Sequence, residues 1–281
     1  MKPVAFEYVA ARSVEEALAA LARDADAKPI AGGQSLVPAL NMRLVRPTLL
    51  VDVNRAGLDA IEANGVVRVG ATVRQAVLER DPRCHPLLRE ALPYVGHFVT
   101  RNRGTVGGSV AHADGSAEIP LCLAALAGTI AAEGPAGRRE IAPEAFFVTH
   151  YLTTLSPGEL LVGTTWPQPG DGEGTAFEEL ALRAGDFALA MIAVKLRRDD
   201  GAARDVRVFA GAVTDTPTAL TEAAASLEGS PVTPDAAREA GARAAAAVDP
   251  AGSIHASAAY LRSLTGTLVE RAVLRAWERS A

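Results

Sequence analysis

Apolar side chains near the start of the chain recur at helical spacing. Val14, Leu18 and Leu21 stand at positions i, i+4 and i+7, which places them on one face of a helix. Ser13 precedes this run and Glu16 follows three residues later, the spacing of a capping box, whose side chains satisfy backbone donors at the first turn. The pattern therefore predicts an amphipathic helix that begins after Ser13.

Two short apolar runs that follow this helix predict strands. They cover residues 28–31 and 49–53, and between them lie a glycine turn at 32–35 and a helical turn at 36–44. Helices and strands that alternate over short connections are typical of a layered α/β unit. We therefore expect a first subdomain over residues 1–55.

The middle of the chain mixes strand and helix patterns. Thr72 and Gln75 repeat the capping-box spacing and predict a helix that begins after Thr72. The other expected elements are a strand at 66–70, helices at 86–95 and from 118, a hairpin of 128–133 with 138–141, and a strand at 160–166. We expect a second subdomain over residues 56–170, followed by a Pro- and Gly-rich linker at 167–174.

The C-terminal part separates its strands from its helices. Three apolar runs at 177–183, 187–197 and 206–213 predict strands, and helix patterns follow at 221–227, 233–248 and 257–279. This order predicts a domain over 175–281 in which a three-stranded sheet packs against a three-helix bundle. The fold class expected for the whole chain is α+β.

Composition narrows the function classes. The chain of 281 residues has 33 acidic and 28 basic side chains, and aromatic residues make up only 5%, which argues against binding to nucleic acid. The longest uncharged apolar run, residues 119–132, is shorter than the roughly 20 residues that a membrane span needs. The N-terminal residues show no export signal, so we expect a cytoplasmic protein.

Two cysteines cannot hold a cysteine-ligated iron–sulfur cluster, which needs four ligands. Cys84 and Cys122 are the only thiols. Cys122 lies in an apolar stretch and is expected in the core, whereas Cys84 follows Asp81-Pro82-Arg83 and is expected in a loop. Any such cluster in the working assembly must therefore belong to another polypeptide.

Two glycine motifs carry the strongest chemical signal. Residues 31–35 and 104–109 both combine paired glycines with hydroxyl side chains, and neither contains lysine. Glycine lets a backbone take positive φ and approach a ligand closely, so that consecutive N–H groups can converge on an anion. Neither segment has the P-loop or G-x-G-x-x-G pattern. Two such loops in different subdomains predict that the pyrophosphate of a dinucleotide is held from both sides.

The same motifs resemble those of a known family. Residues 31–38 (AGGQSLVP) and 103–114 (RGTVGGSVAHAD) are similar to the two flavin motifs of the FAD subunit of molybdenum hydroxylases, the family of carbon monoxide dehydrogenase and xanthine dehydrogenase. The similarity continues through residues 158–161, 185–187 and 260–264. It implies bound FAD and a two-subdomain FAD-binding region of the vanillyl-alcohol-oxidase type. We expect the FAD to be bound non-covalently, because neither glycine motif contains Cys or His.

The resemblance also implies which residues contact FAD. Residues 32–36 and 105–109 are expected at the pyrophosphate and ribityl chain, Glu118 near the adenosine ribose, Leu161 by the adenine, and Phe187 by the isoalloxazine. Asp186 is expected to fix the turn before Phe187 by bonding nearby backbone N–H groups. The full set is Ala31, Gly32, Gly33, Gln34, Ser35, Leu36, Thr105, Gly107, Gly108, Ser109, His112, Asp114, Glu118, Leu161 and Phe187.

One cluster of these residues also has the composition of a metal site. His112, Asp114 and Glu118 are three possible ligands within seven residues. Within a flavin motif local hydrogen bonding is the favoured interpretation, with Asp114 capping the turn at Gly115 and Ser116. We therefore expect no bound metal.

Three functions from different classes remain open. The first is an electron-transfer subunit that passes electrons from the [2Fe–2S] cluster of an iron–sulfur small subunit, itself reduced by a molybdopterin large subunit, through FAD to an external acceptor. The resemblance implies that these three chains form a heterotrimer or a dimer of it. The second is a stand-alone FAD-dependent oxidase or dehydrogenase with its own small-molecule substrate. The third is a nucleotide-binding scaffold without catalysis, against which the intact glycines argue.

Overall fold

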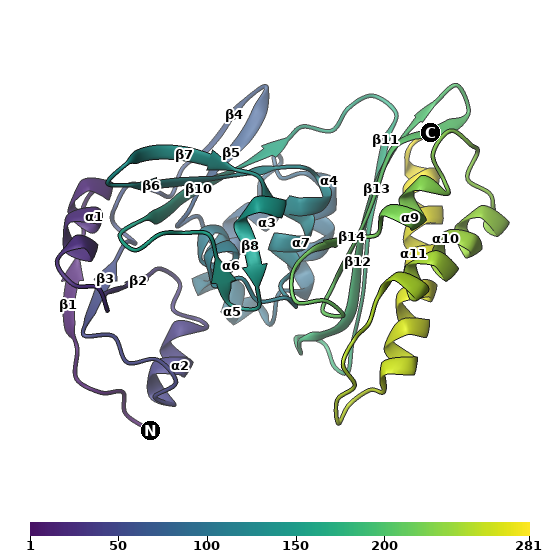
Figure 1. Ribbon diagram of the computed structural model, residues 1–281. Helices are drawn as coiled ribbons and strands as arrows, with labels where there is room; N and C mark the ends of the chain where they lie inside the picture. The colour runs from purple at the N-terminus through teal and green to yellow at the C-terminus, as the bar shows by residue number, and fades with distance from the viewer.

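A computed structural model describes residues 1–281 and shows three larger sheets arranged side by side along the molecule, together with a small two-stranded sheet (Figure 1). The N-terminal sheet occupies one end, the C-terminal sheet and its helices occupy the other, and a helical region lies between them. No helix of the chain is both long enough and apolar enough to span a bilayer.

The first sheet is parallel, with strand order β1-β3-β2. Its elements are β1 (Glu7–Ala10), α1 (Val14–Ala22), β2 (Lys28–Ile30), α2 (Leu36–Asn41) and β3 (Leu49–Asp52). The Ser13 hydroxyl accepts a 3.2 Å bond from the backbone N–H of Glu16, so the predicted cap of α1 is confirmed. Ala17 and Leu21 of this helix pack into one cluster with the buried face of β3.

The second sheet has five antiparallel strands in the order β4-β5-β10-β6-β7. The strands of this region are β4 (Ile61–Asn64), β5 (Val66–Gly70), β6 (Thr129–Gly134), β7 (Gly137–Ile141), β8 (Phe147–Thr149), β9 (Leu152–Thr153) and β10 (Leu160–Pro167). Its helices are α3 (Gln75–Arg80), α4 (Pro86–Ala91), the 3₁₀ turn η1 (Leu92–Tyr94), α5 (Phe98–Arg103), α6 (Val106–His112), α7 (Glu118–Ala125) and α8 (Pro143–Phe146). All eight residues of α7 are buried, so this helix forms the centre of the region.

The third sheet has helices on both faces. Its elements are β11 (Glu173–Ala181), β12 (Ala188–Asp199), β13 (Ala202–Gly211), β14 (Thr218–Ala219), α9 (Thr221–Ala225), α10 (Pro234–Ala247) and α11 (Ala258–Arg279). Met191 of β12 packs into the same core as α4 and α7, whereas the next residue, Ile192, packs with α10 and α11. The alternation of side chains along β12 thus joins the middle region to the C-terminal helices.

Most predicted elements are confirmed, including the hairpin of β6 and β7, the three long C-terminal strands and the three helices after them. Cys84 lies in the loop between α3 and α4 as expected, with its side chain buried, and Cys122 is in the core as expected. One prediction is wrong. Thr72 does not cap α3, because the helix begins only after Arg74, which is extended and forms a bridge with Thr105 of the second glycine motif.

Candidate functional site

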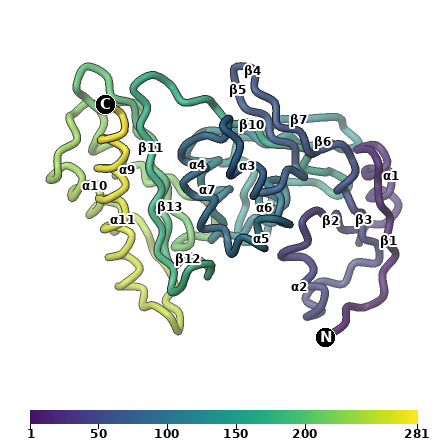
Figure 2. Tube along the Cα trace, turned by 180° about the vertical axis from the view of Figure 1, so that it is seen from behind, coloured from purple at the N-terminus to yellow at the C-terminus, as the bar shows by residue number.

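The two glycine motifs lie in direct contact. A methyl group at Gly32 would fall 2.5 Å from the carbonyl oxygen of Arg103 and 2.8 Å from the Cα of Gly104, distances that no real side chain tolerates. Both views of the molecule place α2, which follows the first motif, beside α5 and α6, which flank and contain the second (Figures 1 and 2). Segments about 70 residues apart in sequence therefore meet at one place.

The first motif is a turn with unused backbone donors. Gly33 has φ +71°, a conformation that glycine adopts without strain. The N–H groups of residues 32–36 donate no hydrogen bond within the chain, and Ser35, the N-terminal cap of α2, uses no side-chain bond there. Gln34 and Ser35 are exposed, so this row of donors is open to a ligand. A turn of this kind has the donor set that a phosphate oxygen needs.

The second motif begins helix α6, and the chain itself uses most of its backbone donors. The N–H groups of Val106, Gly107 and Ser109 donate to the backbone oxygens of Val73, Ala71 and Thr105 at 3.0–3.1 Å. The N–H of Gly108 donates to the Thr105 hydroxyl at 3.1 Å. The chain itself has therefore already satisfied all four donors.

The glycines of the second motif serve packing. Gly107 is buried, and a methyl group there would lie 2.6 Å from the Cα of Ala71. Gly108 lies within α6 without a positive φ, so the backbone freedom expected for it is not used. What this motif offers a ligand is a close approach, the N–H of Thr105 and the hydroxyl of Ser109, neither of which donates a hydrogen bond within the chain.

The end of α6 is fixed by a turn. One carboxylate oxygen of Asp114 accepts from the Ser116 N–H at 2.9 Å and from its hydroxyl at 2.7 Å, so the predicted cap is confirmed. The Tyr151 hydroxyl donates to the other oxygen at 3.2 Å, and the rings of Tyr151 and His112 are 4.8 Å apart. Burial lowers the pKa of His112, which favours its neutral form. No three side chains among His, Cys, Asp and Glu gather in a way that could hold a metal ion.

A buried acid and a half-buried acid lie behind this turn. Glu118, the first residue of α7, is only 8% exposed, and burial raises the pKa of its carboxyl to about 7. Burial, and then the repulsion from Glu118, raises the pKa of Glu179 on β11 to about 8. Each acid is therefore largely protonated at slightly acidic pH.

The remaining two predicted residues differ in exposure. Leu161 lies on β10 with its side chain in the central core, next to a bulge in the pairing with β6, so only its backbone can face a ligand. Phe187 is 75% exposed in the turn between β11 and β12, which excludes a core role. Gly185 in this turn has φ +85°, and a methyl group there would lie 2.5 Å from the His97 ring at the start of α5. The turn closes through the Asp186 N–H and the Arg183 oxygen at 3.1 Å, and the expected bonds from the Asp186 side chain are not formed.

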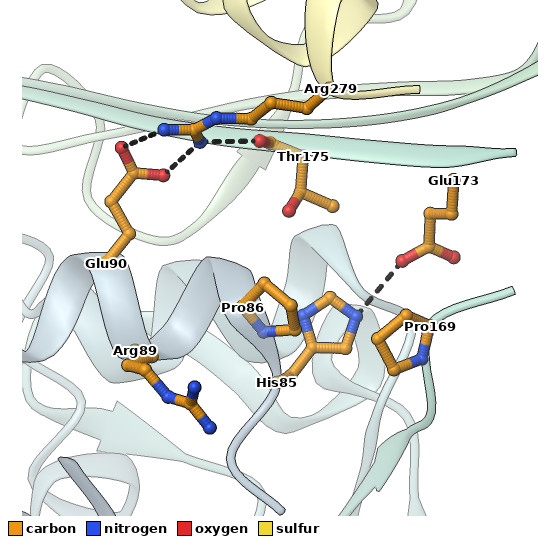
Figure 3. Close-up of a pocket in the computed structure, with 8 residues that line it drawn as sticks. All are labelled: His85, Pro86, Arg89, Glu90, Pro169, Glu173, Thr175 and Arg279. Carbon is orange, nitrogen blue, oxygen red and sulfur yellow. Dashed lines mark hydrogen bonds and ion pairs between the residues drawn. The ribbon is translucent and has the colours of Figure 1, made fainter. Parts of the chain in front are cut away.

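Two cavities lie outside the contact between the motifs. One, of about 710 Å³, separates the Asp24 to Pro29 segment from the turn at Ser156 to Glu159. The other, of about 320 Å³, lies between α4 and β11 (Figure 3). In the second cavity Glu173 binds His85 at 3.0 Å and Lys195 at 3.3 Å. Most charges along this wall are paired within the protein.

Sequence reasoning missed two polar residues that join the motifs. Asn54 donates to the Ala31 oxygen at 2.9 Å, and Arg74 donates both to Asn54 at 2.7 Å and to the Arg103 oxygen. These four residues are 20 or more positions apart, so no local spacing could have indicated the link.

Comparison with known proteins identifies the family. Residues 4–169 match the model described as the FAD binding domain in molybdopterin dehydrogenase, and residues 175–276 match the CO dehydrogenase flavoprotein C-terminal domain. The chain is 39% identical to the 6-hydroxypseudooxynicotine dehydrogenase complex subunit alpha of Paenarthrobacter nicotinovorans, over 100% of this chain and 97% of that one. It is 34% identical to the carbon monoxide dehydrogenase medium chain of Hydrogenophaga pseudoflava over the full length of both.

Solved structures agree with the sequence comparison. Carbon monoxide dehydrogenase from Hydrogenophaga pseudoflava superposes with a TM-score of 0.97 at 36% identity over 100% of both chains. Quinoline 2-oxidoreductase from Pseudomonas putida 86 superposes at 0.95 and 38% identity, over 100% of this chain and 99% of that one. The two glycine motifs in contact, the row of unused donors and the full-length similarity all lead to one conclusion: this chain belongs to the family of FAD-binding medium subunits of the molybdenum hydroxylases.

Proposed function

We propose that the turn at residues 32–36 binds the pyrophosphate of FAD. The observation that carries this assignment is the row of N–H groups that donate no bond within the chain. Such donors bind a doubly charged pyrophosphate well, because the bonds are charge-assisted. Ala31 and Gly32 bring this turn against the second motif, so that the ligand also meets α6.

The other predicted residues take different roles in this proposal. Thr105, Gly107 and Gly108 shape α6 so that it can approach the ligand closely, and the Ser109 hydroxyl and His112 ring supply side-chain contacts. Asp114 holds the end of α6, and Glu118 lies behind it. The backbone of Leu161 faces the adenosine end, and Phe187 covers the isoalloxazine. Bound FAD supplies an acceptor that takes up and releases electrons.

We further propose that the chain works within a heterotrimer, or a dimer of it, with an iron–sulfur small subunit and a molybdopterin large subunit. Both cysteines are buried, so no thiol of this chain is available to a cluster. Exposed apolar side chains next to the Phe187 turn, among them Phe98 at 68%, give a partner a surface to cover. No feature of the structure favours a separate substrate-binding site on this chain.

We also propose that the chain divides into three parts, at about residue 55 and at residues 167–174, because each part has its own sheet.

The proposed pyrophosphate site is tested by Gly33→Val, with Gly65→Val as the matched control. Both glycines have φ +71°, so both variants strain the backbone equally, but nothing lies within 4 Å of a methyl group at Gly65. Gly33→Val should abolish FAD binding, followed by flavin absorbance after purification and by fluorescence titration. Gly65→Val should retain FAD, and acid denaturation should release that FAD intact. FAD retained by Gly33→Val at wild-type affinity would contradict the assignment.

A further inference from the structure

Four side chains form a continuous hydrogen-bonded chain between the two glycine motifs, and we call them the brace: Tyr8, Asp52, Asn54 and Arg74. The Tyr8 hydroxyl donates to one oxygen of Asp52. The other oxygen accepts from the Asn54 N–H at 2.8 Å and from its side-chain amide at 2.6 Å. Asp52 thus fixes which way the Asn54 amide points, with its oxygen toward Arg74.

The brace reaches both motifs through backbone oxygens. Asn54 donates to the Ala31 oxygen at 2.9 Å, Arg74 donates to the Asn54 oxygen at 2.7 Å, and a second Arg74 nitrogen donates to the Arg103 oxygen. The planar fork of a guanidinium can bind two acceptors at a fixed angle. Two side chains, Asn54 and Arg74, therefore link the first motif to the second.

The bond to Ala31 also aims a ligand donor. The Ala31 oxygen and the Gly32 N–H belong to one planar trans peptide, so they point in opposite directions. When Asn54 holds the oxygen, it also fixes the direction of the Gly32 N–H, the first of the row of unused donors. Orientation of the donors before binding lowers the entropy lost when the ligand binds.

The brace also places a positive charge at the contact between the motifs. The half-buried Arg74 guanidinium stays charged, although burial lowers its pKa. Asp52 and Arg103 are the charged groups that affect it, one of each sign. The side chains that hydrogen-bond to the backbone of residues 31–36, those of Gln34 and Asn54, are both neutral.

We infer that Arg74, held by Asn54 and Asp52, is a positioning residue for the pyrophosphate of FAD: it fixes Asn54 relative to the second motif, and Asn54 in turn aims the Gly32 N–H of the first. This inference rests on the proposed function. It adds to the motifs three residues, Asp52, Asn54 and Arg74, that need not touch the cofactor.

The test compares Arg74→Met with Arg80→Met in the full-length chain, together with any subunits that co-purify. Arg80 lies on α3, is exposed and makes no ion pair, so it controls for the loss of one positive charge from this region. Fluorescence titration should show FAD binding weakened at least tenfold in Arg74→Met and unchanged in Arg80→Met. Arg74→Lys keeps the charge but cannot bind both acceptors, and it should lose most of the affinity.

Competition between ligands separates positioning from a general loss of structure. ADP and adenosine displace FAD to different extents if the site recognises phosphate, and Arg74→Met should reduce the ratio of their affinities at least fivefold. Equal weakening of both ligands, or unchanged FAD affinity, would overturn the inference. Gly33→Val, measured in parallel, distinguishes the two claims: if it abolishes binding while Arg74→Met has no effect, only the brace is wrong. If Gly33→Val binds normally, the pyrophosphate site itself is wrong.

Discussion

The two glycine motifs have similar compositions, but their backbone N–H groups are used in opposite ways. The first is a turn whose N–H groups, at residues 32–36, are left for a ligand. The second begins a helix whose N–H groups, from Val106 to Ser109, are all bonded within the chain. Paired glycines next to hydroxyl residues therefore do not by themselves identify an anion site. Whether their N–H groups are free to bind an anion depends on the segment that packs against them.

For the second motif, this segment is residues 71–75. It accepts from Val106 and Gly107 through the oxygens of Val73 and Ala71, and it leaves no room for a side chain at Gly107. No backbone segment accepts hydrogen bonds from the first motif in this way, and the side chains bonded to the motif, those of Asn54 and Gln34, donate to the oxygens of Ala31 and Gly32. The first motif thus keeps its donors, and the second gives the first a surface on which to pack.

The largest effect that would test this comparison is expected from Gly107→Ala. The added methyl group would lie 2.6 Å from the Cα of Ala71, and a backbone atom cannot move aside as a side chain can. We expect the free energy of unfolding to fall by about 3 kcal/mol, the upper end for overpacking, measured by urea denaturation. Gly108→Ala is the control, because the only close atom is the Thr105 hydroxyl, which can rotate.

The Gly108→Ala variant is expected to change the stability of the protein only slightly. The variant loses one capping bond, but alanine favours a helix over glycine by about 1 kcal/mol. The two effects nearly cancel, so its stability should be within about 1 kcal/mol of the parent chain. If Gly108→Ala unfolded the protein as strongly as Gly107→Ala, the packing account of the second motif would be wrong.

The next effect concerns the acid that follows the second motif. The pKa of the Glu118 carboxyl is near 4.5 in an unfolded chain and about 7 in the folded protein, so between these values the folded state holds a proton that the unfolded state has lost. The free energy of unfolding therefore falls as pH rises from about 5 to 8. Glu118→Gln should remove about 2 kcal/mol of this loss, and the melting temperature measured at pH 5 and pH 8 checks it. An unchanged pH dependence would mean that Glu118 is not titrating in this range.

Sequence analysis predicted the long elements and the place of both motifs, but not the backbone of the second motif. The strands β11 to β13 and helix α11 carry patterns long enough to be read locally. Helices α5 and α6 have six and seven residues, include two glycines, and form against residues 71–75. Their conformation depends on a contact about 30 residues away in sequence. The same reason hides Asn54 and Arg74, whose roles exist only once the subdomains meet.

A smaller effect is expected at the third segment of the proposed site. Phe187 is mostly exposed, so Phe187→Ala should leave the melting temperature unchanged. An aromatic contact with the isoalloxazine contributes about 0.5–1.5 kcal/mol beyond burial, so FAD affinity should fall several-fold and the flavin fluorescence should change. Phe98→Ala, at another exposed aromatic, serves as control. If Phe187→Ala kept wild-type FAD affinity and spectrum, Phe187 would not contact the isoalloxazine. The flavin would then be covered by another residue or by a partner chain.

The smallest effect is expected from Ser109→Ala, and it tests the comparison most directly. Its hydroxyl makes no hydrogen bond within the chain, and its N–H is bonded to the Thr105 oxygen, so the variant should fold with unchanged stability. If Ser109 contributes only its hydroxyl, FAD should lose one neutral hydrogen bond, about 1 kcal/mol or roughly fivefold in affinity. Fluorescence titration beside Gly33→Val gives the measure. Should Ser109→Ala abolish binding as Gly33→Val does, the second motif would hold the ligand as strongly as the first, and the division of roles between a donor turn and a packing helix would fail.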